Sequence, residues 1–323
     1  MFSKTEAWSN ITKNGDNIVI VSHPSPDGDA IGSCYALALA LELLDKKPVV
    51  ILDNFNSKYD FLQGKKFLYT GDISKLKCDV FICVDCGDKK RIGEAESIFN
   101  NTPITINIDH HINNGNFARF NYIDTAASST CEVIFDIINM AIPVNKNIAE
   151  ALYTGIVTDT GGFRYSSTSP QTMETVARLM RTGIDFTSIQ YHSLYSRSKV
   201  EVEVFALALS NIEYVQGYPI AYTTLKQSEM EKIGANHSDL DGIVEHVLNI
   251  KGIEIGAFFY ERQVGYTKVS LRSKDIAING VAQSFGGGGH KFAAAANFKA
   301  DFEQGCSQVI NSLKDLLKNG RNS

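Results

Sequence analysis

Residues 17–29 read NIVIVSHPSPDGD, a continuous apolar run that passes into a loop carrying one histidine and two aspartates. Two later segments repeat this order, DVFICVD at 79–85 and ITINIDHH at 104–111. Val/Ile-rich runs of this kind, nearly continuous in apolarity, are typical of parallel strands whose two faces are both covered. The carboxyl ends of such strands meet at one edge of the sheet, so we expect the polar groups that follow them to lie close together.

Strand and helix signals alternate through the first 190 residues, which indicates an α/β fold with a doubly wound, mostly parallel sheet. The apolar runs predict strands at 17–22, 48–52, 79–84 and 104–108. Helical patterns are found at 30–44, 88–99, 130–141, 147–158, 171–182 and 186–194, and the N-terminus predicts a short amphipathic helix. The helix near 130 opens with Ser129-x-x-Glu132, the pattern of a capping box.

From about residue 195 the pattern changes to that of a smaller α+β domain. A helical stretch is followed by predicted strands at 212–216, 219–224, 253–260 and 266–272, and by helices near 238–249, 275–284 and 301–318. A glycine run and a strand of small residues precede the last helix. We therefore divide the chain into a catalytic metal-binding domain at 1–194, a helical linker at 195–210 and a substrate-binding domain at 211–323.

Composition narrows the class of protein. A hydrophobic content of 44% and a charged content of 21% over 323 residues describe a globular protein with room for two cores. No apolar stretch reaches membrane-spanning length, and six scattered cysteines favour reduced thiols in the cytoplasm over a disulfide framework. The net charge of −5 tells against a partner such as a long nucleic acid duplex, because phosphate neutralisation supplies most of that affinity.

The clusters at the predicted strand and helix ends supply carboxylates and imidazoles in an unusual concentration. Their members are His23, Asp27, Asp29, Asp85, Asp109, His110, His111 and Asp159. So much charge is unstable in a buried place without cations, and oxygen and nitrogen ligands suit hard or borderline divalent metals. The pattern predicts a centre with two metal ions that cleaves phosphoesters.

The individual motifs also admit simpler interpretations. Prolines would stiffen the first loop and Gly28 would permit the turn that aims Asp27 and Asp29 inward, yet aspartates here also fit a mere turn and helix N-cap. Asp85 at a strand end suits a carboxylate that bridges two ions, and Asp109 suits an acceptor that orients a histidine ring. Cys83 and Cys86 form a CxxC pair within a strand, which favours packing over a structural zinc or a redox pair.

The second domain offers groups for an anion. Consecutive glycines at 286–289 let backbone N–H groups approach a phosphate, and Arg272 and His290 would add charged donors. A flexible loop is the simpler interpretation of the glycines alone. Because these groups lie in a domain separate from the metal ligands, they predict a substrate held in a cleft between the two domains.

Taken together, the motifs resemble the DHH phosphoesterase superfamily, named for the sequence at 109–111, and the GGGGH element resembles its DHHA1 domain. The resemblance implies two Mn²⁺ ions, with Mg²⁺, Co²⁺ or Zn²⁺ as substitutes. It implies that His23 and Asp27 bind one ion, that Asp29, His110 and Asp159 bind the other, and that Asp85 bridges them. Catalytic roles would fall to His111, at the scissile phosphate, and to Asp85. The implied substrate-binding residues are Arg272, Ser273, Gly287, Gly288, Gly289 and His290.

A chain of this length with both domains is similar to the bacterial nanoRNase/pAp phosphatase branch of the family. That branch implies cleavage of short single-stranded RNA (about two to five nucleotides) to mononucleotides and removal of the 3′-phosphate of pAp, with pApA as a further substrate. Exopolyphosphatase-like activity, single-strand exonuclease activity and a non-catalytic nucleotide-binding regulator are the alternatives. We expect no membrane partner, and a homodimer is compatible with the sequence.

Overall fold

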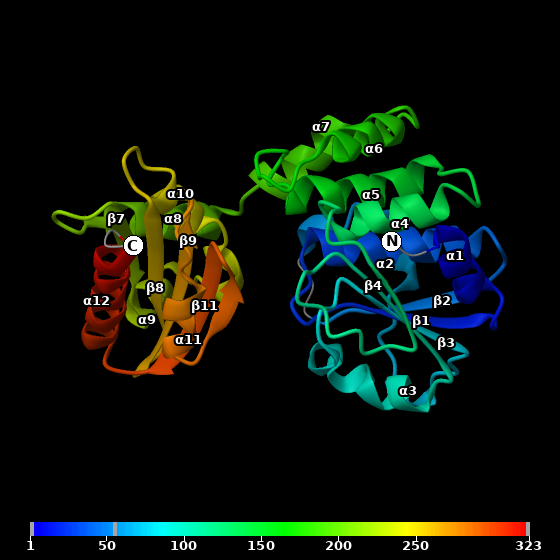
Figure 1. Cartoon of the computed structure of the whole chain (residues 1–323), viewed down its shortest axis with the longest axis horizontal. Helices are drawn as coiled ribbons and strands as arrows, with labels where there is room; N and C mark the ends of the chain where they lie inside the picture. Colours follow the sequence, from blue (N-terminus) through cyan, green and yellow to red (C-terminus); the bar gives the residue numbers. More distant parts are fainter. Residues whose placement is uncertain (1–2, 54–56, 321–323) are drawn as a thin grey trace. The chain divides into compact units, whose positions relative to one another are not determined.

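The computed structural model describes residues 3–53 and 57–320, without the side chain of His290. The chain divides into two compact units, Met1–Ser196 and Arg197–Ser323, each with its own sheet (Figure 1). No helix among the described residues is long and apolar enough to cross a membrane.

The sheet of the first unit is parallel throughout, with strand order β2-β1-β3-β4-β5. The strands are β1 (Asn17–Val21), β2 (Lys47–Ile51), β3 (Val80–Val84), β4 (Ile104–Asp109) and β5 (Phe120–Ile123). The prediction of an α/β fold with a parallel sheet is confirmed. The sequence analysis missed β5, which has four residues and a fully buried side chain only at Tyr122, so it lacks the apolar run of the other strands.

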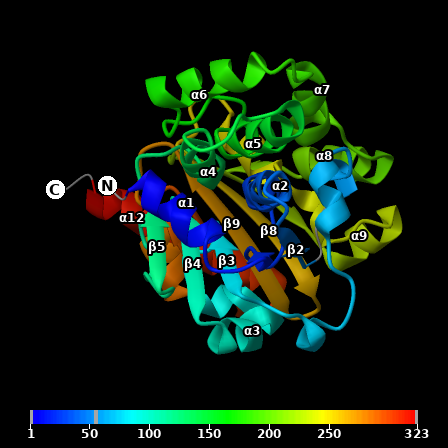
Figure 2. The same ribbon diagram turned by 90° about the vertical axis from the view of Figure 1, so that its right-hand side faces the viewer.

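Helices cover both faces of this sheet (Figures 1 and 2). On one face lie α1 (Lys4–Thr12), α2 (Gly28–Glu42), α4 (Thr130–Ile138) and α5 (Lys146–Asp159), and on the other α3 (Glu96–Asn101). The smaller helices α6 (Pro170–Met180) and α7 (Phe186–Gln190) pack on α5. Almost every residue of α2 is buried, because its alanines and glycines let it fit between the sheet and α5.

Two predicted helices of this unit are shorter than expected. The range 88–99 divides into a 3₁₀ turn at Lys89–Ala95 and α3, because Gly93 takes a φ of +64° that no helix continues through. The range 186–194 holds α7 followed by a wider π-type turn at Tyr191–Tyr195.

The second unit has a mixed six-stranded sheet in the order β10-β11-β9-β8-β7-β6. Its strands are β6 (Glu213–Tyr214), β7 (Ile220–Leu225), β8 (Ile255–Gln263), β9 (Tyr266–Ser273), β10 (Gly288–His290) and β11 (Ala293–Lys299). Only β7 and β8 run parallel among these neighbours. One face packs on α11 (Asn279–Ser284) and α12 (Phe302–Gly320), and the other on α8 (Lys199–Ser210), α9 (Gln227–Ile233) and α10 (Ile243–Leu248). This confirms the α+β character of the C-terminal half.

The segment expected to be a helical linker, 195–210, contains α8. Val204 and Ala208 of this helix are buried in a core shared with Leu225 and Phe258 of the sheet. The helix therefore belongs to the packing of the second unit. The predicted helix near 238–249 is interrupted at Gly242, whose φ of +86° separates a short 3₁₀ turn from α10.

Candidate metal centre

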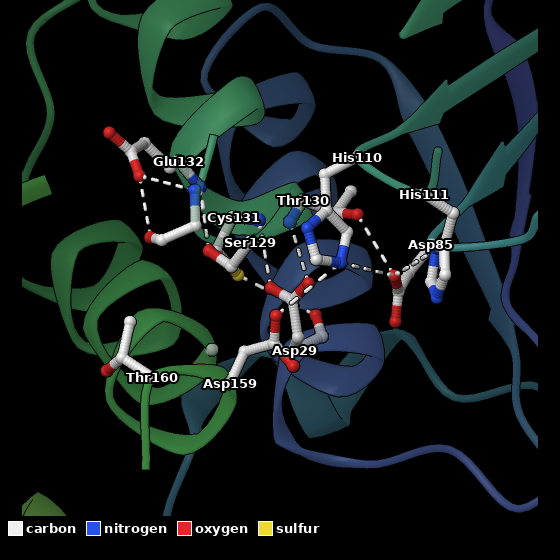
Figure 3. Close-up of polar contacts among 12 residues, drawn as sticks. Asp29, Asp85, His110, His111, Ser129, Thr130, Cys131, Glu132, Asp159 and Thr160 are labelled. Atoms are coloured by element: carbon white, nitrogen blue, oxygen red, sulfur yellow. Dashed lines mark hydrogen bonds and ion pairs between the residues drawn. The ribbon is translucent and has the colours of Figure 1, made fainter. Parts of the chain in front are cut away.

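The sequence-predicted metal ligands come together at the carboxyl edge of the first sheet. His23, Asp27 and Asp29 follow β1, Asp85 follows β3 and His110 follows β4, while Asp159 is the last residue of α5. Figure 3 shows Asp29, Asp85, His110 and Asp159 converging. Their donor atoms form three groups, in each of which all atoms lie within 4.8 Å of one another. The groups are His23–Asp27–Asp85, Asp29–His110–Asp159 and Asp85–His110–His111. Asp85 belongs to two of them, and His110 links the second group to the third.

The spacing of these atoms suits cations better than direct hydrogen bonds. His23 Nε2 lies 3.5 Å from Asp85 Oδ2, and His110 Nε2 lies 3.4 Å from Asp159 Oδ2 and 3.7 Å from Asp85 Oδ1. These distances exceed the range of good nitrogen–oxygen hydrogen bonds. Side chains of opposite sign that converge without bonding directly are a suitable donor set for divalent ions that prefer imidazole and carboxylate ligands.

Charge crowding in this place changes the acid–base properties of the carboxylates. Burial, together with the negative charge of Asp85, raises the pKa of Asp29 well above its usual range and that of Asp159 to about 7, although His110 partly offsets this. For Asp85 burial acts in the same direction, but the nearby ring of His23 and the charges of the neighbouring histidines outweigh it and lower the pKa to about 2. Bound cations would relieve the same repulsion, so the residues present fit a metal centre.

The same carboxylate charges favour the charged form of His110, whereas they disfavour the charged forms of Asp29 and Asp159. Burial favours the neutral ring, but the carboxylates of Asp29, Asp159 and Asp85 outweigh that and raise the pKa of His110 to about 9. The ring therefore stands where positive charge is strongly favoured. A metal ion bound there would replace the proton, because a ligating imidazole must be neutral.

The loops that carry these ligands hold strained backbone. Asp85 has a φ of +53°, and Ser25, between the two prolines of the first loop, has a φ of +56°. Aspartate tolerates this left-handed conformation better than most residues, and such strain is commonly found at functional sites. Gly28 does not have the role that the sequence suggested. It lies in α2, without a positive φ, and a Cβ there would collide with the side chain of Thr158.

Asp27 is both a helix N-cap and a candidate metal ligand, the two roles that the sequence left open. Its Oδ1 accepts the backbone N–H groups of Asp29 and Ala30, so it is the N-cap of α2. The same side chain supplies a donor atom to the group with His23 and Asp85. A carboxylate has lone pairs enough for a cap and a cation at once.

Asp109 lies behind the centre and orients His111. It is fully buried, and its Oδ1 lies 2.7 Å from Nδ1 of His111 and accepts the backbone N–H of His110 at 2.8 Å. Its Oδ2 accepts a hydrogen bond from Nδ2 of Asn114 at 2.6 Å. This contact fixes the tilt of the His111 ring, whose Nδ1 also lies 3.5 Å from Asp85 Oδ1, in agreement with the group that Asp85, His110 and His111 form.

Sequence reasoning missed the first turn of α4, which holds two of the carboxylates. The backbone N–H groups of Thr130 and Cys131 donate to Asp29 at 2.7 and 2.9 Å, and the Thr130 hydroxyl donates to Asp85 at 3.1 Å (Figure 3). The partial positive charge of a helix N-terminus stabilises the ionised form of Asp29. The segment Ser128–Glu132 is mostly polar and leads into the mainly apolar helix α4. This change in the sequence is the signal that could have indicated the role.

Glu132 anchors this turn from behind. The predicted capping box is only half formed: Ser129 accepts the N–H of Glu132, but the Glu132 carboxylate is directed elsewhere. Its Oε2 accepts hydrogen bonds from the backbone N–H and hydroxyl of Ser128, at 2.9 and 2.6 Å, and from the Thr172 hydroxyl of α6 at 3.0 Å. Glu132 is 3% exposed, so this network ties α6 to the residues that hold Asp29 and Asp85.

The two cysteines of the CxxC pair serve packing. Both are buried in the apolar cluster beneath β3, and the Cys86 thiol donates to the carbonyl of Asp88. Burial raises the pKa of Cys86 to about 12 and that of Cys83 well above its usual range, which leaves both as neutral thiols. Among the described residues neither joins a metal-binding group.

The predicted substrate-binding residues all lie in the second unit, and several are already engaged. Arg272 on β9 donates from Nε to Glu245 Oε1 at 2.9 Å and from Nη1 to the carbonyl of Leu271, so its guanidinium is held in place. The Ser273 hydroxyl donates to the carbonyl of Ile276. Glu245, on α10, is a contact that sequence reasoning did not find.

The glycine run does not form the expected nest of N–H groups. The N–H of Gly286 donates to Gln283 and that of Gly287 to Ala282, while Gly288, Gly289 and His290 form β10 beside β11. A Cβ at Gly287 would collide with the Ala295 carbonyl, so glycine there serves close strand packing. Gly286 and Gly288 face open space, and the side chain of His290 lies outside the described part of the chain.

Comparison with known proteins places the chain in a family. The model of the DHH family N-terminal domain matches residues 17–156, and that of the DHHA1 domain matches residues 217–319. A probable bifunctional oligoribonuclease and PAP phosphatase NrnA of Streptococcus mutans is 30% identical, over 94% of this chain and 96% of its own length.

Two solved structures agree with this. An exopolyphosphatase-related protein from Bacteroides fragilis is 31% identical and superposes with a TM-score of 0.89, over 98% of this chain and 97% of its own. The exonuclease RecJ bound to manganese, 14% identical with a TM-score of 0.54 over 96% of this chain and 94% of its own, shares the fold. The chain belongs to the DHH family, with a DHH domain followed by a DHHA1 domain, and is a hydrolase acting on phosphoester bonds.

We expect Asp85→Asn to lower kcat by at least about 100-fold, because this carboxylate belongs to more than one group of metal-binding atoms. Asparagine tolerates the positive φ of this position, so the fold should remain stable. Steady-state kinetics and metal analysis, with thermal unfolding as the control, will check this. Near-wild-type activity in the folded variant would contradict a shared role for Asp85.

We expect Thr172→Val to weaken metal binding by about tenfold, because it removes a hydroxyl that holds Glu132 and, through it, the α4 turn. Thr175→Val is the matched control: it lies on the same helix, is equally buried, and its hydroxyl has no hydrogen-bond partner. Titration calorimetry with Mn²⁺ measures both variants. Equal affinities for the two would show that the network does not position the ligands.

Proposed function

We propose that this protein is a manganese-dependent phosphoesterase that degrades RNA of about two to five nucleotides to mononucleotides and converts pAp to AMP. The observation that carries the proposal is the set of three donor groups joined through Asp85 and His110. The Streptococcus mutans relative, whose name states both activities, matches nearly the whole chain, which supports the same substrates here. The dinucleotide pApA, which contains the same phosphodiester link, is a further proposed substrate.

The ligands divide naturally between two cations. His23 and Asp27 would hold one, Asp29, His110 and Asp159 would hold the other, and Asp85 would contact both. Mixed imidazole and carboxylate donors favour manganese over magnesium, with cobalt or zinc as substitutes. Bound ions of this kind lower the pKa of water and neutralise charge on a phosphate.

The other residues of the centre position the reacting phosphate. His111, oriented by Asp109, would donate a hydrogen bond to an oxygen of the scissile phosphate. The α4 turn holds Asp29 and Asp85 in place before substrate arrives, which reduces the reorganisation needed during the reaction. In the second unit Arg272, its guanidinium fixed by Glu245, would bind a phosphate of the nucleotide.

A second candidate is polyphosphate hydrolysis, because the Bacteroides fragilis structure is described as an exopolyphosphatase-related protein. The same metal centre would serve a phosphoanhydride, so the distinction depends on whether a nucleoside is required. A regulator without catalysis is disfavoured by the convergence of every predicted metal ligand.

One substrate panel tests these functions. With Mn²⁺ at fixed ionic strength we expect release of mononucleotides from RNA of two and five nucleotides, AMP from pAp, and steeply slower turnover of RNA of twelve and twenty-four nucleotides. The net charge of −5 gives a longer strand little additional attraction. Equal rates on the longest and shortest RNA would favour a RecJ-like exonuclease, and turnover of polyphosphate alone would favour the second candidate.

We expect Arg272→Ala to raise the KM for pAp by roughly 10- to 100-fold, the equivalent of about 1.5–3 kcal/mol for a charge-assisted contact. The manganese content should not change, because the metal groups are formed by first-unit residues. Arg272→Lys retains the charge and serves as the control. A variant that loses manganese, or that binds every nucleotide as before, would exclude this role for Arg272.

A further inference from the structure

The face of β9 turned away from α11 and α12 carries a row of polar side chains. Burial alternates strictly along the strand, with Thr267, Val269, Leu271 and Ser273 buried and the residues between them partly exposed. The partly exposed residues Lys268, Ser270 and Arg272 therefore share one face. We call them the β9 row.

The neighbouring strand leaves this row uncovered. In the antiparallel pairing with β11, Arg272 lies opposite Ala293, Ser270 opposite Ala295 and Lys268 opposite Asn297. The methyl groups of Ala293 and Ala295 are too short to cover the neighbouring side chains of Arg272 and Ser270 from solvent. On the other side, β8 places Phe258 and Tyr260 next to the row. Both are buried beneath the helices of that face, with exposed fractions of 3% and 5%.

Lys268 adds a positive charge to the row. Its ammonium lies 5.5 Å from the ring centroid of Tyr260, and within the part of the chain that the structure describes no carboxylate forms an ion pair with it. His237 stacks on the same tyrosine ring, and its pKa is lowered by burial and by the charges of Arg262 and Lys268. Positive charge is thus concentrated at this end of the row.

The spacing of the row matches a single-stranded nucleic acid. Residues two apart on a strand are separated by about 6.7 Å, which is close to the spacing of neighbouring phosphates in an extended oligonucleotide. We propose that the β9 row binds successive phosphates of a short RNA, with Arg272 and Lys268 contacting phosphates two nucleotides apart and Ser270 contacting the one between. This inference rests on the proposed function and adds a subsite that depends on substrate length.

A length rule follows from the geometry. Lys268 stands four residues from Arg272, or about 13 Å along the strand. A ligand as short as pAp or a dinucleotide cannot reach both. With the scissile phosphate at the metal centre, the row needs three further phosphates, which a 5′-phosphorylated RNA of four nucleotides provides. Lys268 therefore contributes nothing to the smallest substrates and helps to bind those of four nucleotides or more.

The test compares Lys268→Ala with Lys314→Ala, a variant with the same loss of charge on α12, which covers the opposite face of the sheet. We measure kcat/KM with Mn²⁺ on pAp and on 5′-phosphorylated RNA of two, three and five nucleotides. For Lys268→Ala we expect unchanged values on pAp and on RNA of two and three nucleotides and a fall of roughly three- to tenfold on RNA of five nucleotides, since a partly exposed lysine gives a modest contact. Lys268→Arg should restore the loss, and Lys314→Ala should change nothing.

A fall shared by pAp and every RNA, or no fall on any, would overturn the proposal. Binding of 5′-labelled RNA of two and five nucleotides, measured by fluorescence anisotropy in Ca²⁺, separates it from the proposed function. If the wild type binds the five-nucleotide RNA more tightly than the dinucleotide through Lys268 but hydrolyses neither, the β9 row stands and the proposed function fails. If the wild type hydrolyses both RNAs and Lys268→Ala binds both as tightly as the wild type does, the proposed function stands and the role of the β9 row fails.

Discussion

Repulsion among carboxylates at one edge of the first sheet is the constraint on which the rest of this structure depends. Asp29, Asp85, Asp109 and Asp159 are all partly or fully buried there, and each raises the pKa of its neighbours. A protein does not keep such a group together for stability, because an apolar edge would cost less. Its presence indicates a site that is completed by cations and that the surrounding elements are built to hold.

The way in which the carboxylates are held follows from that constraint. Each is met by a donor or a histidine that favours its ionised form: the α4 turn for Asp29, the histidines and Thr130 for Asp85, Asn114 with His111 for Asp109, and His110 for Asp159. Behind the α4 turn, Glu132 is itself a buried carboxylate satisfied by Ser128 and Thr172. Orientation of ligands by such outer contacts is a general property of metal sites, and here it reaches as far as α6.

In the second unit, contacts with neighbouring residues decide how much of its positive charge stays accessible. Glu245 fixes Arg272 while taking part of its charge, and the small residues of β11 leave the β9 row uncovered. The glycine run contributes by packing, since Gly287 allows β10 to approach β11 where a side chain would collide with the Ala295 carbonyl. A glycine-rich motif that suggests anion binding in sequence can thus act mainly through the strand that it allows to form.

By itself the sequence determined the fold class and the membership of the metal centre, because both depend on local patterns. Unbroken apolar runs specify buried parallel strands, and the ends of parallel strands converge whatever the details of packing. Tertiary structure decided what supports the ligands. The contacts of Thr130 and Cys131 with Asp29 join residues about a hundred positions apart, and the bond from Thr172 to Glu132 depends on how α6 packs. Whether an N–H of the glycine run is free, or α8 is a linker or a core helix, likewise depends on neighbours distant in sequence, which no local pattern encodes.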